Sequence, residues 1–161
     1  ELPNTISRSM IPKSGGYILL LFVPLPTTVT VGKLGDMTLQ EGTYYYGGSA
    51  RRALPSRINR HFAREKKAHW HIDYLTNSAN VQTVEAWCYA DSPDVEHRLK
   101  SSGKLDSSGI LKGFGSGDCS SGCHSHLWRG TAELAPEDFG QKPYIEPNSG
   151  NESKPQDSRT E

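Results

Sequence analysis

The chain has 161 residues, enough for one domain with a core, and its 34% hydrophobic content with 16 glycines and 10 prolines indicates many loops. Its net charge is zero, so composition alone does not indicate a nucleic-acid partner, and no apolar run is long enough to span a membrane. Three cysteines are too few, and odd in number, for a disulfide framework. We therefore expect a reducing compartment, the cytoplasm or, in a eukaryote, the nucleus.

The first half of the chain predicts three strands. Tyr17–Val23 is apolar throughout, which is typical of a buried central strand. Thr28–Val31 is rich in β-branched residues and predicts a second strand, and Tyr44–Gly48 predicts a third that runs into a glycine turn. Because side chains alternate along a strand, Tyr44 and Tyr46 share one face and the tyrosine between them points to the other.

A helix is predicted from Pro55 to about Lys66, because proline suits the first helical turn. Its apolar positions recur every four residues and form one stripe, Leu54, Ile58 and Phe62. His61 falls at the border between this stripe and a separate basic stripe, where it would line a cleft at the edge of the core. A half-buried histidine bonded to the backbone is the alternative reading.

The segment around this helix is strongly basic. Seven basic residues and one acidic residue lie between positions 51 and 67, a net charge of +6, whereas the rest of the chain carries −6. Such a patch on a neutral protein is an electrostatic footprint for a polyanion, although a solvated helix face is the commoner explanation of a charge run. Besides Arg57, the candidate nucleic-acid-binding residues are Arg51, Arg52, Arg60, Arg64, Lys66 and Lys67.

The second half predicts a short helix from His71 and a strand over Val81–Tyr89. Ser92-Pro93-Asp94 has the residues that favour a helix start, with serine as the N-cap, and this helix would bury Val95 and Leu99.

The remaining segments are poor in apolar residues. Lys104–Cys123 is rich in glycine and serine and predicts a loop, and His126–Trp128 predicts a short strand or turn. Asn148–Glu161 is polar and predicts disorder. We therefore expect an N-terminal segment over residues 1–13, one domain over 14–135, and a polar, disordered tail over 136–161.

This order of elements predicts a small α+β domain with a mostly antiparallel sheet of three to four strands flanked by helices. Two strand tyrosines followed by Arg57 and His61 indicate a site that handles phosphate esters, because the arginine guanidinium offers a permanently charged fork for phosphate oxygens.

These residues resemble the GIY-YIG nuclease superfamily, and within it the branch called DUF123. The nuclease pattern is matched in order by Gly15-Gly16-Tyr17, Tyr46-Gly47-Gly48, Arg57, His61 and Glu96. The DUF123 branch is matched by the block His69-Trp70-His71-Ile72-Asp73-Tyr74-Leu75 and by the later stretch 113–119 followed by His126-Leu127. The interval between Tyr17 and Tyr46 is longer than in most such nucleases, which implies an inserted hairpin around Val29–Leu39.

The resemblance implies a role for each matched residue. Tyr17 would act as a general base or position the attacking water, with Tyr46 beside it on the neighbouring strand. Arg57 would stabilise the phosphate charge, and His61 would assist proton transfer or orientation. Glu96 would bind one divalent metal ion, magnesium or manganese. Tyr17 and Tyr46 as core aromatics, and Glu96 as a helix-start carboxylate, are the structural alternatives.

A second constellation is the loop spacing of Cys119, Cys123 and His126. Zinc is bound by cysteine and histidine at short loop spacings, but this spacing is not a standard pair of zinc knuckles. A turn with incidental thiols, or a glycine-rich loop that holds phosphate through backbone amides, accounts equally for the pattern.

The sequence thus predicts a metal-dependent nuclease that hydrolyses phosphodiester bonds in DNA during repair or recombination. The sequence does not distinguish DNA from RNA. The alternatives are a non-catalytic nucleic-acid-binding module and a zinc-stabilised structural or interaction domain.

Overall fold

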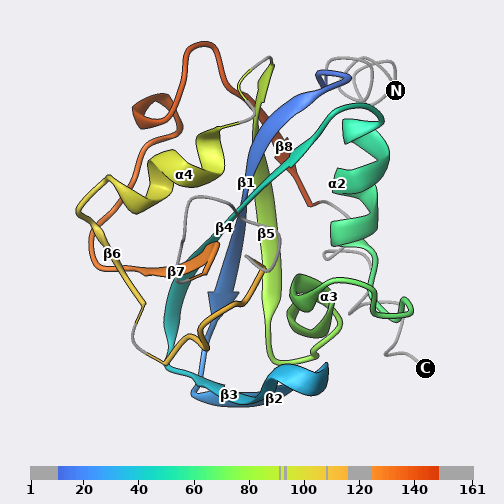
Figure 1. Cartoon of the computed structure of the whole chain (residues 1–161), viewed down its shortest axis with the longest axis vertical. Helices are drawn as coiled ribbons and strands as arrows, with labels where there is room; N and C mark the ends of the chain where they lie inside the picture. The colour runs from blue at the N-terminus through green and yellow to red at the C-terminus, as the bar shows by residue number, and fades with distance from the viewer. Residues whose placement is uncertain (1–10, 91, 93, 108, 116–124, 149–161) are drawn as a thin grey trace, which may run out of the picture.

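The computed structural model describes residues 11–90, 92, 94–107, 109–115 and 125–148, apart from the side chains of residues 96 and 100. These residues form an α+β fold in which a six-stranded sheet has the strand order β6-β7-β4-β1-β5-β8 (Figure 1). All described strand pairs are antiparallel. The α+β class and the antiparallel sheet predicted from the sequence are confirmed, although the sheet has six strands rather than three to four.

Three long strands make the centre of this sheet, namely β1 (Gly15–Val23), β4 (Gly42–Ala50) and β5 (Gln82–Ala90). Shorter strands extend it at both edges, namely β6 (Leu105–Asp106), β7 (Leu127–Gly130) and β8 (Tyr144–Pro147). Strand β1 lies between β4 and β5, as its continuous apolar sequence predicts for a strand covered on both faces.

The inserted hairpin is also present. Strands β2 (Thr27–Val31) and β3 (Gly35–Leu39) form a separate two-stranded sheet, joined by the 3-10 turn η1 (Gly32–Leu34). Its inward side chains, such as Val31 and Met37, are buried against the main core, whereas the alternate threonines are exposed.

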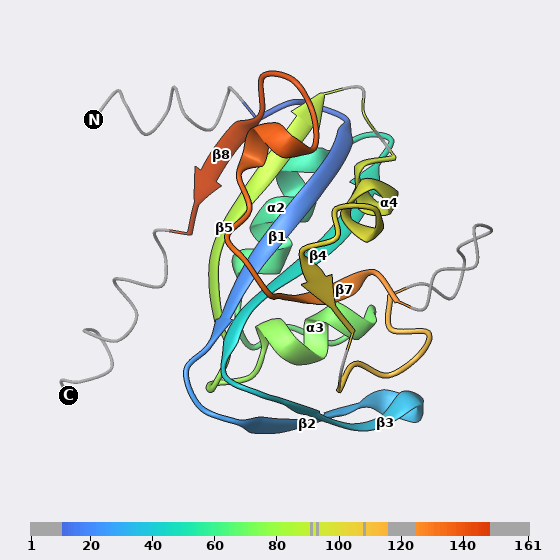
Figure 2. The same cartoon turned by 90° about the vertical axis from the view of Figure 1, so that its left-hand side faces the viewer.

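The helices cover the two faces of the main sheet. Helices α2 (Leu54–Phe62) and α3 (His71–Thr76) lie on one side, and α4 (Val95–Lys100) lies on the other (Figures 1 and 2). The α2 side buries Leu54 and Ile58 in the larger core, and the α4 side buries Val95 and Leu99 in a second core. Each strand therefore presents one set of alternate side chains to α2 and the other set to α4.

Two predicted helix boundaries are wrong. Helix α2 ends at Phe62 rather than near Lys66, because Ala63 adopts an extended backbone (ψ 139°) and Glu65 a left-handed one (φ 56°). Helix α4 begins at Val95 with Asp94 at the N-cap position, so the predicted N-cap at Ser92 is wrong. The backbone carbonyl of Ser92 instead accepts a hydrogen bond from Val95 N–H in a turn before the helix.

The region beyond residue 100 is more ordered than its composition indicates. Strand β6 interrupts the predicted loop over residues 104–123 and pairs with β7. The predicted tail contains the 3-10 turn η2 (Pro136–Asp138) and the edge strand β8, which pairs with β5. Backbone pairing with a distant strand orders β8, and composition does not show such pairing. Residues 1–10 and 149–161 lie outside the described residues.

Within the part of the chain that the structure describes, no helix has the length and apolar character needed to cross a membrane.

Asn148 fixes the end of β8 to the domain. Its backbone N–H donates to Val84 O (3.0 Å), its buried side-chain Nδ2 donates to Thr83 O (2.8 Å), and the residue is 7% exposed. We expect Asn148→Ala to lower the free energy of unfolding by about 1–2 kcal/mol, because the buried carbonyl of Thr83 loses its side-chain donor. Urea unfolding measures this, with Asn80→Ala at an exposed position as the control. Equal values for the two variants would contradict the assignment of Asn148 to the folded domain.

Candidate functional site

Tyr17 and His61 form the centre of the site. Tyr17 Oη lies 2.7 Å from Nε2 of His61, and the two residues are 1% exposed each. Tyr17 projects from β1 towards α2, and His61 projects from the last turn of α2 towards the sheet. The structure therefore joins two of the residues that the sequence analysis selected, although they are 44 positions apart.

Gly48 leaves the space that the Tyr17 ring occupies. It stands directly opposite Tyr17 in the β1–β4 register, and a Cβ atom at Gly48 would lie 2.6 Å from Cζ of Tyr17. The sequence predicts a glycine turn after Tyr46, and this is wrong, because β4 continues through Gly47 and Gly48 to Ala50. Glycine is required here for the close approach of the tyrosine ring rather than for a turn.

Tyr46 lies on the same face of the sheet, opposite Leu19. Its ring is 6.2 Å from that of His61, in an edge-to-face arrangement, and 6.3 Å from the ring of Phe114. The alternation predicted for the tyrosine run is confirmed, because Tyr44 and Tyr46 belong to the core under α2 and Tyr45 belongs to the core under α4.

His61 is neutral at neutral pH. Burial lowers the pKa of His61 from 6.5 to about 3, and the positive charges of Arg57, Lys66 and Arg60 add to this effect, whereas Asp73 opposes it. Its Nδ1 has no hydrogen-bond partner among the described residues. A neutral imidazole has one nitrogen that accepts a hydrogen bond and one that donates. His61 can therefore accept a hydrogen bond from the Tyr17 hydroxyl at Nε2 while both groups stay neutral.

The partly exposed Arg57 and the exposed Trp70 lie beside His61 of this pair. One N–H of Arg57 donates to Ser49 O (3.0 Å), and the guanidinium carbon is 4.5 Å from the centre of the Trp70 ring. Trp70 in turn lies 6.1 Å from the His61 ring, and Arg60 lies 5.0 Å from the Trp70 ring. The site thus combines buried aromatic groups with half-exposed cations, an arrangement suited to an anion that approaches from solvent.

Asp73 holds the two helices of the site together. Its buried Oδ2 accepts hydrogen bonds from the backbone N–H groups of His69 (2.8 Å) and Trp70 (3.0 Å) and pairs with Arg60 at 2.7 Å. Burial alone would raise the pKa of Asp73, but these donors, Trp70 and His69 first, hold it below its ordinary value. Asp73 and Trp70 belong to the block that resembles the DUF123 branch, but the sequence pattern indicated no role for either residue. Asp73 at the third position of a short helix is a capping signal that could have been found.

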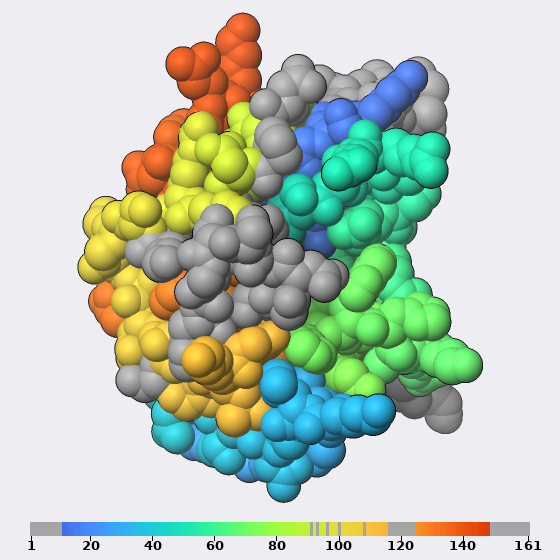
Figure 3. Space-filling view, in the orientation of Figure 1, coloured from blue at the N-terminus to red at the C-terminus, as the bar shows by residue number. Residues whose placement is uncertain are grey.

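The candidate nucleic-acid-binding residues fall into two groups. Three of them make side-chain contacts within the protein: Arg60 with Asp73 and Lys67 O, Arg64 with Ser78 O, and Lys66 with Ala63 O, Thr76 and Asn77. Burial lowers the pKa of Lys66 to about 8. The other three, Arg51, Arg52 and Lys67, are exposed. Helices α2 and α3 reach the surface side by side (Figure 3).

The predicted metal ligand Glu96 belongs to α4, and its side chain lies outside the described residues. The preceding Val95 packs so closely on Gly16 that any side chain at position 16 would overlap it. Val95 belongs to the core under α4, so this helix meets β1 on the face opposite to the one from which Tyr17 projects. Among the described residues, no group of three or more His, Cys, Asp or Glu side chains is arranged to hold a metal ion. The single metal ion expected at Glu96 therefore stays a prediction.

The predicted zinc ligands Cys119 and Cys123 lie outside the described residues. His126 is buried at the start of the β7 region, and its ring is 5.4 Å from that of His97 on α4. His71, also considered for zinc, accepts a hydrogen bond at Nδ1 from Gly115 N–H (2.9 Å).

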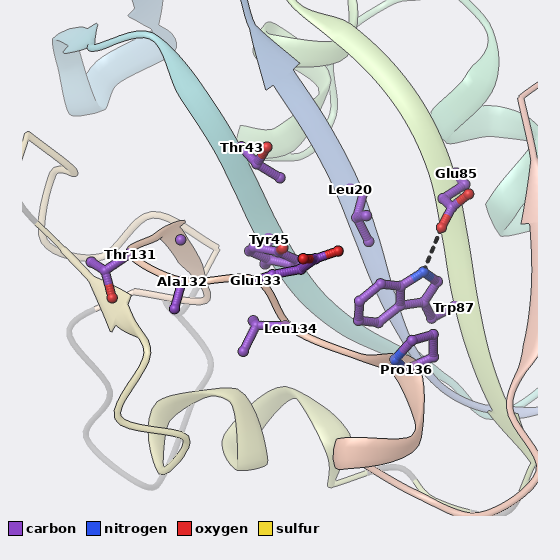
Figure 4. A pocket seen from close by; sticks show the side chains of 11 residues that line it. Leu20, Thr43, Tyr45, Glu85, Trp87, Thr131, Ala132, Glu133, Leu134 and Pro136 are labelled. Atoms are coloured by element: carbon purple, nitrogen blue, oxygen red, sulfur yellow. Dashed lines mark hydrogen bonds between the residues drawn. The ribbon is translucent and has the colours of Figure 1, made fainter.

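A pocket of about 670 Å³ lies on the other face of the sheet (Figure 4). Tyr45 and Trp87 line it, and Trp87 Nε1–H donates to Glu85 Oε2 at 2.7 Å. Both aromatic residues belong to the core under α4, so the sheet separates this pocket from Tyr17 and His61.

The fold and the site define an α+β domain in which a tyrosine of a central strand and a histidine of α2 form a buried pair next to a cationic, aromatic surface. The sequence matches the family model described as "Domain of unknown function DUF123" over residues 16–142, and the chain belongs to this family. The matched range includes all five residues to which the nuclease resemblance gives a role, namely Tyr17, Tyr46, Arg57, His61 and Glu96. The searches of curated proteins and of solved structures gave no match.

The low pKa of His61 predicts how stability depends on pH. The unfolded chain takes up a proton at this residue near pH 6.5, whereas the folded chain does so only near pH 3. The contribution is therefore complete above about pH 6.5 and is lost as the pH falls, by at most about 1.4 kcal/mol per pH unit.

We expect this slope to be smaller in His61→Gln than in the original protein when urea unfolding is measured from about pH 7 to about pH 5. His69→Gln, at an exposed position, is the control. An NMR titration in which the His61 ring protonates near pH 6 would contradict its burial as a neutral group.

Asp73→Asn tests the anchor between the helices. We expect a loss of about 3 kcal/mol in the free energy of unfolding, because Arg60 loses its buried partner and two backbone donors lose a charged acceptor. Glu41→Gln changes an exposed carboxylate in the same way and should be nearly neutral. A cost below about 0.5 kcal/mol for Asp73→Asn would show that the anchor is not needed.

Proposed function

We propose that this protein is a metal-dependent nuclease that hydrolyses phosphodiester bonds in DNA, acting in repair or recombination. The observation that carries the proposal is the 2.7 Å contact between Tyr17 Oη and His61 Nε2 next to the Arg57 guanidinium. A phenol oxygen oriented by a neutral imidazole, with a permanent cation close by, is the combination that hydrolysis of a phosphate diester needs.

The resemblance to the GIY-YIG nucleases supports the same assignment. That pattern pairs a tyrosine on each of two neighbouring strands, and here β1 and β4 pair so that Tyr17 and Tyr46 project from the same face. The arginine and histidine of the pattern, Arg57 and His61, then follow on α2, which packs on that face. The family match as such assigns no activity, so the nuclease reading rests on these residues and their arrangement.

The chemistry follows from the protonation states. His61 accepts a hydrogen bond from the Tyr17 hydroxyl at Nε2, which fixes the direction of the phenol oxygen towards the attacking water. As the water attacks phosphorus and the bond from phosphorus to the leaving oxygen breaks, Tyr17 Oη holds the water in line, and the proton that the water loses passes through solvent to the leaving oxygen. His61 stays neutral, because burial and the positive charge of Arg57 hold its pKa at about 3. An ordinary tyrosine has a pKa of about 10 and is a poor base near neutrality, so Tyr17 acts by positioning the water.

Arg57 binds the phosphate. One of its N–H groups is held by Ser49 O, and its plane is held against Trp70, so the remaining donors have a defined direction. A guanidinium fixed in this way stabilises the charge that develops on the phosphate oxygens without reorganising during the reaction. Glu96 would hold one magnesium or manganese ion, which supplies Lewis-acid stabilisation of the phosphate and leaving oxygen.

Incubation with labelled single-stranded, nicked, branched and duplex DNA in the presence of magnesium or manganese tests the proposal. We expect cleavage to fall by about 100-fold or more in Tyr17→Phe, His61→Gln and Glu96→Gln, because each removes a group that acts in the hydrolysis. Tyr44→Phe is the matched control, because Tyr44 is an equally buried tyrosine of β4 whose hydroxyl donates to the Gln40 carbonyl (2.8 Å).

Two outcomes would contradict the proposal. Equal cleavage by Tyr17→Phe and Tyr44→Phe would remove Tyr17 from the mechanism. Binding of DNA with no cleavage of any of these substrates under either metal would favour the non-catalytic nucleic-acid-binding module.

A further inference from the structure

We propose that the substrate presents an unpaired nucleotide, and that Trp70 stacks on its base while the adjacent phosphate lies at Arg57 and Tyr17. This inference rests on the proposed function and adds the class of nucleic acid that the site recognises, namely single-stranded DNA or an unpaired segment of a duplex.

The exposure of Trp70 is the first observation. Four large hydrophobic residues are exposed among those described, Phe22, Leu25, Trp70 and Val84, and Trp70 is 40% exposed. Of these four residues, Trp70 lies next to the tyrosine–histidine pair, with its ring centre 6.1 Å from that of His61. An indole kept in solvent beside a polar site is a surface for stacking rather than a core side chain.

The second observation is the support beneath the indole. Arg57 and Arg60 are three residues apart on α2 and therefore project from the same side of the helix. Both guanidinium groups lie against the Trp70 ring, at 4.5 Å and 5.0 Å from its centre. The indole thus lies against two cations, and 40% of the residue is still exposed to solvent. A base stacked there would place its phosphates next to these positive charges.

The third observation is that Trp70 is fixed before any ligand binds. Its backbone N–H donates to the buried carboxylate of Asp73, which also binds Arg60. The backbone of Trp70 and the Arg60 cation against its ring are therefore held by the same carboxylate. A platform that is already ordered loses little conformational freedom on binding, which favours its use in recognition.

The geometry selects an unpaired base. Inside a duplex both faces of a base are covered by its neighbours, so stacking on a protein ring requires a nucleotide that is already free or is pulled out of the helix. The three rings of Trp70, His61 and Tyr17 follow one another at 6.1 Å and 5.3 Å, from the surface to the buried pair. A base on Trp70 would therefore place its own phosphate close to Tyr17.

Binding without divalent metal tests this inference. Fluorescence anisotropy would compare a labelled single-stranded oligonucleotide with its duplex at one fixed salt concentration. We expect the single strand to bind more tightly than the duplex. Trp70→Ala should weaken single-strand binding by about 5- to 150-fold, the range for loss of one stacked base, and should leave duplex binding nearly unchanged. Trp70→Phe should keep most of the affinity, because phenylalanine also stacks.

Two control variants separate stacking from other effects. Phe22→Ala removes another exposed aromatic side chain (38% exposed) and should change neither affinity. Lys67→Ala removes an exposed charge and should weaken single-strand and duplex binding by the same factor, with a smaller dependence on salt. If Trp70→Ala only displaced Arg57 and Arg60, it would resemble Lys67→Ala and weaken both.

Single abasic sites give an independent readout. We expect one abasic position in the oligonucleotide to weaken binding to the original protein and to have no further effect on Trp70→Ala, because both changes remove the same stacking contact. Additive effects of the two changes would overturn the inference. Equal binding of single strand and duplex by the original protein would overturn it as well.

These outcomes are separable from failure of the proposed hydrolysis. A Trp70-dependent preference for single strands without any cleavage would reject the nuclease and keep the inference. Cleavage of duplex DNA that depends on Tyr17, with no Trp70-dependent preference, would keep the nuclease and reject the inference.

Discussion

The close passage of the Tyr17 ring over Gly48 is the constraint on which the rest of the site depends. Because position 48 has no side chain, the tyrosine of β1 can lie across β4 and reach the histidine at the end of α2. The contact fixes α2 against the sheet, buries His61 and keeps it neutral. Once α2 is fixed, Arg57 and Arg60 have a defined place on its outer side, where Trp70 packs on them. The packing of the core at Gly48 therefore determines where the charged and aromatic groups of the surface lie.

Asp73 has the complementary role at the surface. A buried carboxylate is costly unless it is bonded, and here two backbone N–H groups and one guanidinium donate to Oδ2 of Asp73, whereas its Oδ1 has no hydrogen-bond partner among the described residues. The interaction begins α3, holds the backbone of Trp70 and pairs the partly exposed Arg60. Much of the basic segment is therefore part of the architecture, because Arg60, Arg64 and Lys66 all bond to backbone or side-chain groups of the protein. The exposed charge on this side of the molecule comes from Arg51, Arg52 and Lys67.

Local patterns predicted the elements well and their ends less well. The apolar run of β1, the apolar stripe of α2 and the β-branched hairpin strands each carry their own periodicity, so these elements were predicted at nearly their observed positions. The end of α2 and the start of α4 were wrong, because backbone conformations at Ala63 and Ser92 depend on the surrounding packing. Strand β8 was missed because its order comes from pairing with β5, which lies more than fifty residues earlier in the chain.

The sequence by itself determined the α+β class, the two faces of the tyrosine strand and the set of residues that resembles a nuclease site, because each of these depends on spacing along the chain. Only the tertiary structure decided that the glycines after Tyr46 continue a strand, that His61 is neutral, and that the aspartate and tryptophan of the DUF123 block act together. The physical reason is that burial and hydrogen bonding between segments 13 to 44 residues apart set these properties. A residue's charge state and its freedom to contact a ligand are properties of its neighbours in space.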